Sequence, residues 1–80
     1  MNNCPWKKIT DFQSLSEFNR FVDWIGEEIR SGAAEDVAVA KPYLDGNTFK
    51  EKWFRHIESG KIWRLVWPDA PFHGVFEPVE

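Results

Sequence analysis

Apolar side chains recur with the period of a helix in the first half of the chain. They stand four, three and four residues apart at Phe18, Val22, Ile25 and Ile29. Leu15 and Phe21 widen this stripe, and polar or charged side chains fill most of the remaining positions. The pattern predicts an amphipathic helix over about residues 15–31, with one face in the core and the rest solvated.

Local signals mark both ends of this helix. Ser14 and Glu17 form a capping box, in which the serine hydroxyl accepts from the N–H of Glu17 and the carboxylate reaches back. Gly32 is placed to end the helix in a left-handed conformation, and Arg30 suits the negative end of the helix dipole. Gly26, inside the helix, predicts the close approach of another element.

Alternating and β-branched residues then predict strands. Residues 35–44 indicate one that ends or reaches a sheet edge at Pro42, followed by a turn at 45–47. Residues 48–57 and 61–67 predict an antiparallel pair, which Pro68 and Pro71 terminate. A short edge strand at residues 7–10 and a final strand through Val75 and Phe76 are further expectations.

The turn between the central strands admits two registers. A two-residue loop at Ser59-Gly60 would place Arg55 opposite Arg64, where like charges repel. A three-residue loop with Gly60 left-handed would instead place Arg55 opposite Trp63, which is the arrangement we favour. In either register the strands carry apolar side chains on both faces. The helix is therefore expected to cover one face of the sheet and to leave the other as a candidate interface.

These elements predict an α+β fold in which one N-terminal helix packs on a three- to four-stranded antiparallel sheet. A chain of 80 residues is expected to form one domain, residues 1–80, with a single core. Five Trp and seven Phe residues supply large apolar surfaces for so short a chain. Some of these rings are expected at the surface, where exposed aromatic side chains are typical of binding patches.

Charge and cysteine content narrow the classes of function. Thirteen acidic and ten basic side chains give a net charge of −3, which argues against nucleic acid as a partner. The single cysteine cannot close an intramolecular disulfide, and the N-terminus resembles no secretory signal. No segment has the apolar length of a membrane span. We therefore expect a soluble, cytoplasmic protein without a membrane partner.

No pattern in the chain indicates catalysis, a metal or a cofactor. The soft metal ligands Cys4, His56 and His73 do not stand at zinc-site spacing. The serines have structural roles as caps and turns, and no glycine-rich phosphate loop is present. We expect a protein that is not an enzyme.

Acidic side chains gather on the helix and just beyond it, at Asp23, Glu27, Glu28, Glu35 and Asp36. Such a group is most often a solvated face. It would also suit a cationic partner, such as a nuclease surface that holds phosphate.

The C-terminal half of the chain contains a specific order of residues. It consists of Trp53, Phe54-Arg55, the turn Glu58-Ser59-Gly60, Trp63 after Ile62, Pro68 and His73-Gly74. This order resembles that of a family of bacterial immunity proteins, the immunity protein 27 type, encoded beside polymorphic toxins. The chain departs from that family at Ser59, at Arg64 in place of an acidic residue, and at Val75-Phe76 in place of glycines.

The resemblance implies a protein that binds one cognate toxin and blocks its active site or an adjacent surface. The residues predicted to contact this partner are Arg55, Trp63, Arg64 and Trp67 from the hairpin, with Glu27, Glu28, Asp36 and Asp69 as electrostatic contributors. The chain itself is expected to be a monomer or a weak homodimer. The alternative is a scaffold module that self-associates through an open sheet face or an edge strand, and an enzyme is the third hypothesis.

Overall fold

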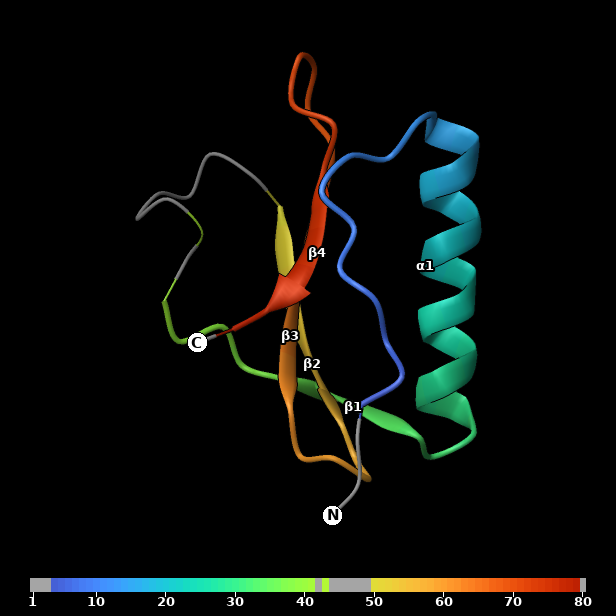
Figure 1. Cartoon of the computed structure of the whole chain (residues 1–80), viewed down its shortest axis with the longest axis vertical. Coiled ribbons are helices and arrows are strands. Elements are labelled where there is room, and N and C mark those ends of the chain that lie inside the picture. Colours follow the sequence, from blue (N-terminus) through green and yellow to red (C-terminus); the bar gives the residue numbers. More distant parts are fainter. Residues whose placement is uncertain (1–3, 42, 44–49, 80) are drawn as a thin grey trace.

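A computed structural model describes residues 4–41, 43 and 50–79 of the chain. The elements are α1 (Leu15–Arg30), β1 (Ala34–Val37), β2 (Glu51–His56), β3 (Ile62–Val66) and β4 (Val75–Pro78). The strands form an antiparallel sheet in the order β1-β2-β3-β4, and α1 stands beside it (Figure 1). This arrangement confirms the predicted α+β fold, with four strands in the sheet.

The local signals at the ends of α1 act largely as predicted. The hydroxyl of Ser14 accepts a hydrogen bond from the N–H of Glu17 at 3.0 Å. The carboxylate of Glu17 accepts from the N–H of Gln13 at 2.7 Å, one residue before the position that a capping box uses. At the other end Gly32 has φ +87°, and the N–H of Ala33 donates to the carbonyl of Glu28 at 2.9 Å. This is the geometry of a Schellman motif, which satisfies the last carbonyls of the helix.

Two expectations about α1 are wrong. Leu15 does not widen the core stripe, because its side chain is 68% exposed. Phe18 packs instead against Phe12 and Trp67, with ring centroids 5.1 and 5.4 Å away, and Leu15 lies outside this contact. Gly26 does not mark a close approach, since a Cβ atom built there would meet nothing within 4 Å.

Strand β1 is much shorter than the sequence pattern predicts. It pairs with β2 from Ala34 to Val37, where Val37 lies opposite Trp53. Since β2 begins at Glu51, few residues of β2 remain as pairing partners for the chain beyond Val37. The predicted end of this strand at Pro42 and the turn at 45–47 lie outside the described residues.

The edge strand predicted at residues 7–10 is reduced to a single bridge. The N–H of Ile9 donates to the carbonyl of Phe76 at 2.8 Å, and the N–H of Phe76 donates back at 2.7 Å. The final strand is confirmed, because Val75 and Phe76 open β4. Ile9 therefore covers the outer edge of β4 at one position.

Both predicted registers of the β2–β3 hairpin are wrong. Trp53 lies opposite Arg64, and Arg55 lies opposite Ile62. The two arginines are therefore not a facing pair, and Arg55 is not shielded by Trp63.

The chemistry of the hairpin loop explains this register. The N–H of His56 donates to the carbonyl of Lys61 at 2.9 Å, which leaves residues 57–60 as the loop, with Gly60 at φ +75°. The ring Nδ1 of His56 accepts from the N–H of Ser59 at 3.3 Å and lies 2.8 Å from its hydroxyl. The His56 side chain therefore stabilises a loop that is longer than the two-residue and three-residue loops considered from the sequence.

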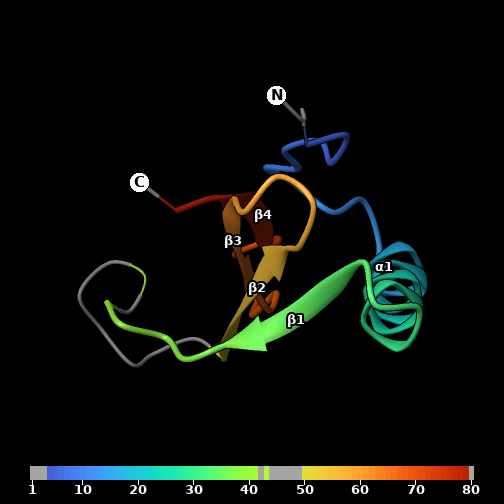
Figure 2. The ribbon, with the colours of Figure 1, turned by 90° about the horizontal axis from the view of Figure 1, so that it is seen from below.

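The N-terminal segment contributes Trp6 to the core. It runs alongside β4 on the side toward α1, and Figure 2 shows the twist of the sheet from below. Trp6 is 7% exposed, and its indole N–H points to a carboxylate oxygen of Glu28 at 3.3 Å. Its ring centroid lies 4.9–5.8 Å from four other rings, those of Trp24, His56, Trp63 and Phe76. Trp6 therefore joins α1, the hairpin and β4.

Candidate functional site

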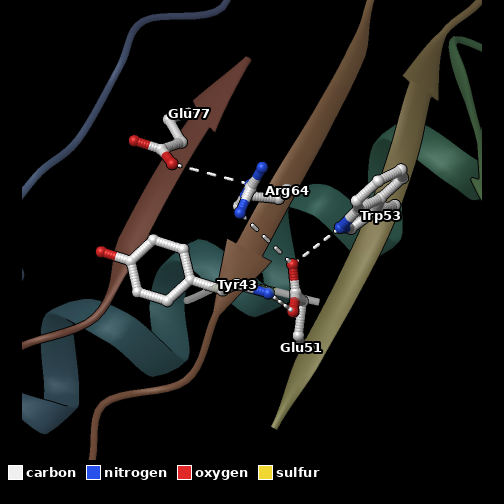
Figure 3. A network of polar contacts seen from close by, with 5 residues as sticks. All are labelled: Tyr43, Glu51, Trp53, Arg64 and Glu77. Carbon is white, nitrogen blue, oxygen red and sulfur yellow. Dashed lines mark hydrogen bonds and ion pairs between the residues drawn. The ribbon is translucent and has the colours of Figure 1, made fainter. Parts of the chain in front are cut away.

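The sheet face away from α1 holds two of the hairpin residues predicted to contact a partner, Arg55 and Arg64. Phe54, Leu65 and Phe76 belong to the core beside α1. Their neighbours along the strands point the other way, and on that face Trp53, Arg64 and Glu77 lie in one row across β2, β3 and β4. We call Tyr43, Glu51, Trp53, Arg64 and Glu77 the Arg64 network (Figure 3).

Arg64 lies between two carboxylates in this network. Its guanidinium nitrogens are 3.9 Å from Glu51 and 3.6 Å from Glu77. Glu51 also accepts hydrogen bonds from the indole N–H of Trp53 at 2.7 Å and from the backbone N–H of Tyr43 at 2.8 Å. The side chain of Arg64 is only 17% exposed and that of Glu51 only 7%. Such a pair is screened far less than one at the surface.

Two aromatic rings flank the Arg64 guanidinium. Its central carbon lies 5.4 Å from the ring centroid of Tyr43 and 5.8 Å from that of Trp53. These distances are within the range of cation–π attraction. The Nε of Arg64 is buried without a hydrogen-bond partner, so the contact with Glu77 is electrostatic rather than a hydrogen bond. The Arg64 side chain is therefore engaged within the fold, and little of its surface is accessible to a partner.

We expect Arg64→Ala to lower the free energy of unfolding by about 1–3 kcal/mol, since it leaves the buried carboxylate of Glu51 without its cation. Urea unfolding measures this change. Arg55→Ala is the matched control, because the Arg55–Glu35 pair of 2.9 Å is 43% and 49% exposed and should contribute less than about 1 kcal/mol. Equal losses in the two variants would contradict a structural role for the network.

The two hairpin tryptophans predicted to contact a partner differ in position. Trp63 is 3% exposed and stacks on Phe76 with centroids 4.8 Å apart. It lies in the core and offers no surface to a partner. Trp67 is partly buried between the ring of Phe18 at 5.4 Å and the Nζ of Lys50 at 4.8 Å.

The predicted acidic contributors are mostly paired within the chain. Glu27 forms an ion pair with Arg30, and Glu28 accepts from Trp6. Asp36 lies 3.9 Å from Lys52. These carboxylates therefore form a mixed rather than a strongly negative surface.

Asp69 lies apart from the other acidic contributors. It is exposed in the connection between β3 and β4, where its backbone pairs with that of Phe72 through two hydrogen bonds of 3.0 Å. The structure does not bring it together with the carboxylates of α1.

One partly exposed tryptophan was not among the residues predicted to contact a partner. Trp24 is 38% exposed, whereas Trp6, Trp53 and Trp63 are at most 7% exposed. Its ring edge contacts Trp6, with centroids 5.7 Å apart, and it packs against Phe21 at 5.2 Å. The helical period of the sequence could have identified this exposure, since Trp24 falls outside the stripe of buried residues on α1.

The described residues show no arrangement suited to a metal or a membrane. In the described ranges, no group of three His, Cys, Asp or Glu side chains is placed to hold a metal ion. The helix that the structure describes lacks the length and apolar character needed to cross a bilayer.

Comparison with protein families, with curated proteins and with solved structures finds no match to this chain. The resemblance to the immunity protein 27 type therefore stays a prediction from the sequence.

Proposed function

We propose that this chain is a small cytoplasmic immunity-type protein of bacteria that binds and neutralises a cognate toxin through a protein–protein interface. The observation that carries the proposal is the exposure of Trp24 on α1, which is 38%. Tryptophan is enriched among the residues that dominate interface energies. The order of residues from Trp53 to Gly74 supports the toxin as the class of partner.

The surface around Trp24 is mixed in charge, with exposed Arg20 one helical turn before it, and its two nearby carboxylates can pair with basic side chains of a partner. Asp23 precedes it, and Glu27 lies one helical turn further on, where both are exposed. The Glu27–Arg30 pair is 66% and 70% exposed, so it contributes little to stability and can exchange partners easily. We call Asp23, Trp24 and Glu27 the Trp24 face. Carboxylates around an aromatic anchor would steer a cationic surface and fix its orientation.

Co-expression tests this proposal in cells. The chain is expressed with the product of the reading frame adjacent to its gene, and growth and co-purification are measured. We expect the chain to restore growth and to co-purify with that product. Failure of both, with the two proteins soluble, would contradict neutralisation.

Substitution of Trp24 then locates the interface. We expect Trp24→Ala to weaken toxin binding by about 30-fold or more, because a central tryptophan anchor contributes about 2 kcal/mol or more. The variant also loses ring contacts worth about 1 kcal/mol each, so binding is measured by calorimetry at a temperature where circular dichroism shows it folded. Ile57→Ala is the matched control, since Ile57 is 45% exposed at the hairpin loop. Equal affinities for both variants would place the interface elsewhere.

A further inference from the structure

His56 is a buried titratable side chain at the start of the β2–β3 loop. It is the last residue of β2, it is 5% exposed, and its ring packs edge-on against that of Trp6, with centroids 4.9 Å apart. Histidine is the side chain that ordinarily changes its charge between about pH 5 and 8. A change of charge on this ring would therefore act directly on the loop that follows it.

Hydrogen bonds between His56 and Ser59 require an unprotonated Nδ1. This nitrogen accepts from the backbone N–H of Ser59 at 3.3 Å. The hydroxyl of Ser59 accepts from the N–H of Lys61 at 3.2 Å, so its own hydrogen can point to Nδ1, which lies 2.8 Å away. A neutral imidazole with its hydrogen on Nε2 provides this acceptor. The neutral ring and the Ser59 hydroxyl therefore hold the backbone of the loop at Ser59 and at Lys61.

Protonation of the ring removes this acceptor. Nδ1 then carries a hydrogen and can only donate, as both ring nitrogens do in the imidazolium ion. It can still donate to the hydroxyl oxygen of Ser59, but the backbone N–H of Ser59 loses its partner. An unmade hydrogen bond and a buried charge both cost free energy unless another group compensates for them.

The charged residues around His56 do not supply that compensation. They lie next to its contacts on each neighbouring element: Lys7 in the N-terminal segment, Glu28 on α1, Glu35 on β1, and Glu58 and Lys61 at the loop. Glu28 accepts from the indole N–H of Trp6, and Glu35 pairs with Arg55 on the sheet face away from α1. None of the ion pairs between described residues includes His56. A charge on this ring would therefore be buried without a paired carboxylate.

We propose that His56 makes the β2–β3 loop sensitive to pH, so that the loop is closed over a neutral ring and released when the ring is protonated. Because the closed loop needs the neutral ring, the open loop takes up a proton more readily, and the closed state loses stability as the pH falls from about 8 to about 5. We expect the protection of the Ser59 amide against hydrogen exchange to fall by about tenfold. This factor corresponds to about 1.4 kcal/mol, close to the net value of one hydrogen bond.

Nuclear magnetic resonance of the unaltered chain tests the proposal. The ring signals of His56 report its protonation. The exchange rate of the Ser59 amide, corrected for the ordinary effect of pH on exchange, reports the opening of the loop. We expect both to follow one titration curve, with protection lost as the ring becomes charged. The amides in the middle of α1 should keep their protection, because the change is confined to the loop.

His56→Asn separates the acceptor from its titration, because the side-chain oxygen of asparagine can take the place of Nδ1 and accepts at every pH. We expect the Ser59 amide of this variant to show no loss of protection as the pH falls. His73→Asn is the matched control, since the side chain of His73 is 59% exposed and is paired with Asp11, away from the loop. Its Ser59 amide should respond to pH as in the unaltered chain.

Constant protection of Ser59 while the His56 ring becomes charged would overturn the proposal, and so would a ring that stays neutral down to about pH 5. A response to pH that persists in His56→Asn would also overturn it, because another group would then be its source. If His56→Asn does not fold, the agreement of the two curves in the unaltered chain and in His73→Asn decides the question. The proposal does not rest on toxin binding, which uses the Trp24 face.

Discussion

Replacing Trp6 by alanine should lower the free energy of unfolding by about 3–5 kcal/mol, the usual cost of removing a buried tryptophan. The reason is its position among four rings drawn from α1, the hairpin and β4. The substitution also leaves Glu28 without its indole donor. Since domains of this size are stable by only about 5–15 kcal/mol, a large share of the stability is lost.

Urea unfolding followed by circular dichroism measures this loss. Trp24→Ala is the matched control, because Trp24 is 38% exposed and touches fewer rings, so it should lose clearly less. If Trp6→Ala proves largely unfolded, Trp6→Phe keeps a ring in the site and should fall between the two. A loss below about 1 kcal/mol in Trp6→Ala would show that the N-terminal segment is not part of the core.

Gly74→Ala should lower the free energy of unfolding by about 2–5 kcal/mol, for two reasons that add. Gly74 has φ +88°, a conformation that residues with a Cβ atom rarely adopt. A Cβ atom there would also lie 3.1 Å from the ring of Phe12, 3.1 Å from the carbonyl oxygen of Val66 and 3.3 Å from Pro68. The glycine of the His73-Gly74 pair is therefore explained by packing at this corner.

Two other glycines separate these contributions. Gly60→Ala has the strained φ of +75° but meets nothing within 4 Å, so it should lose about 1–3 kcal/mol from strain alone. Gly26→Ala lies in α1 with open space around it and should gain about 0.5–1 kcal/mol. In thermal unfolding, Gly26→Ala should therefore be the most stable of the three variants, Gly60→Ala intermediate and Gly74→Ala the least stable. A Gly74→Ala variant as stable as Gly26→Ala would contradict the described corner.

The parts of the fold that could be predicted depend on local sequence. The period of the apolar side chains gave α1, and Ser14, Glu17 and Gly32 marked its ends because capping involves neighbours only. Prolines marked the end of β3, and alternating apolar residues indicated β2 to β4. These signals were enough for the fold class.

The errors came from interactions that the hydrophobic pattern of the sequence does not reveal. The hairpin register depends on the bond between the His56 ring and Ser59, a side chain that competes with the tight turns. The end of β1 depends on where β2 begins. The role of Trp6 depends on contacts across the whole chain, and a short polar segment gives no periodicity from which to infer them.

The candidate site was predictable in residue type but not in exposure. Arg64 and Trp63 are residues that favour interfaces, yet Arg64 lies between two carboxylates and Trp63 lies in the core. Exposure follows from the register and from what covers each face of the sheet. Only the helical period, which sets Trp24 apart from the buried stripe, pointed to an accessible tryptophan.

Calorimetric titration of the purified chain into the purified product of the adjacent reading frame tests the proposed function most directly. We predict a saturable one-to-one complex in which the toxin loses its activity, and a marked loss of affinity in Trp24→Ala but not in Ile57→Ala. The absence of any complex between two folded proteins at concentrations of about 100 μM would contradict the proposal.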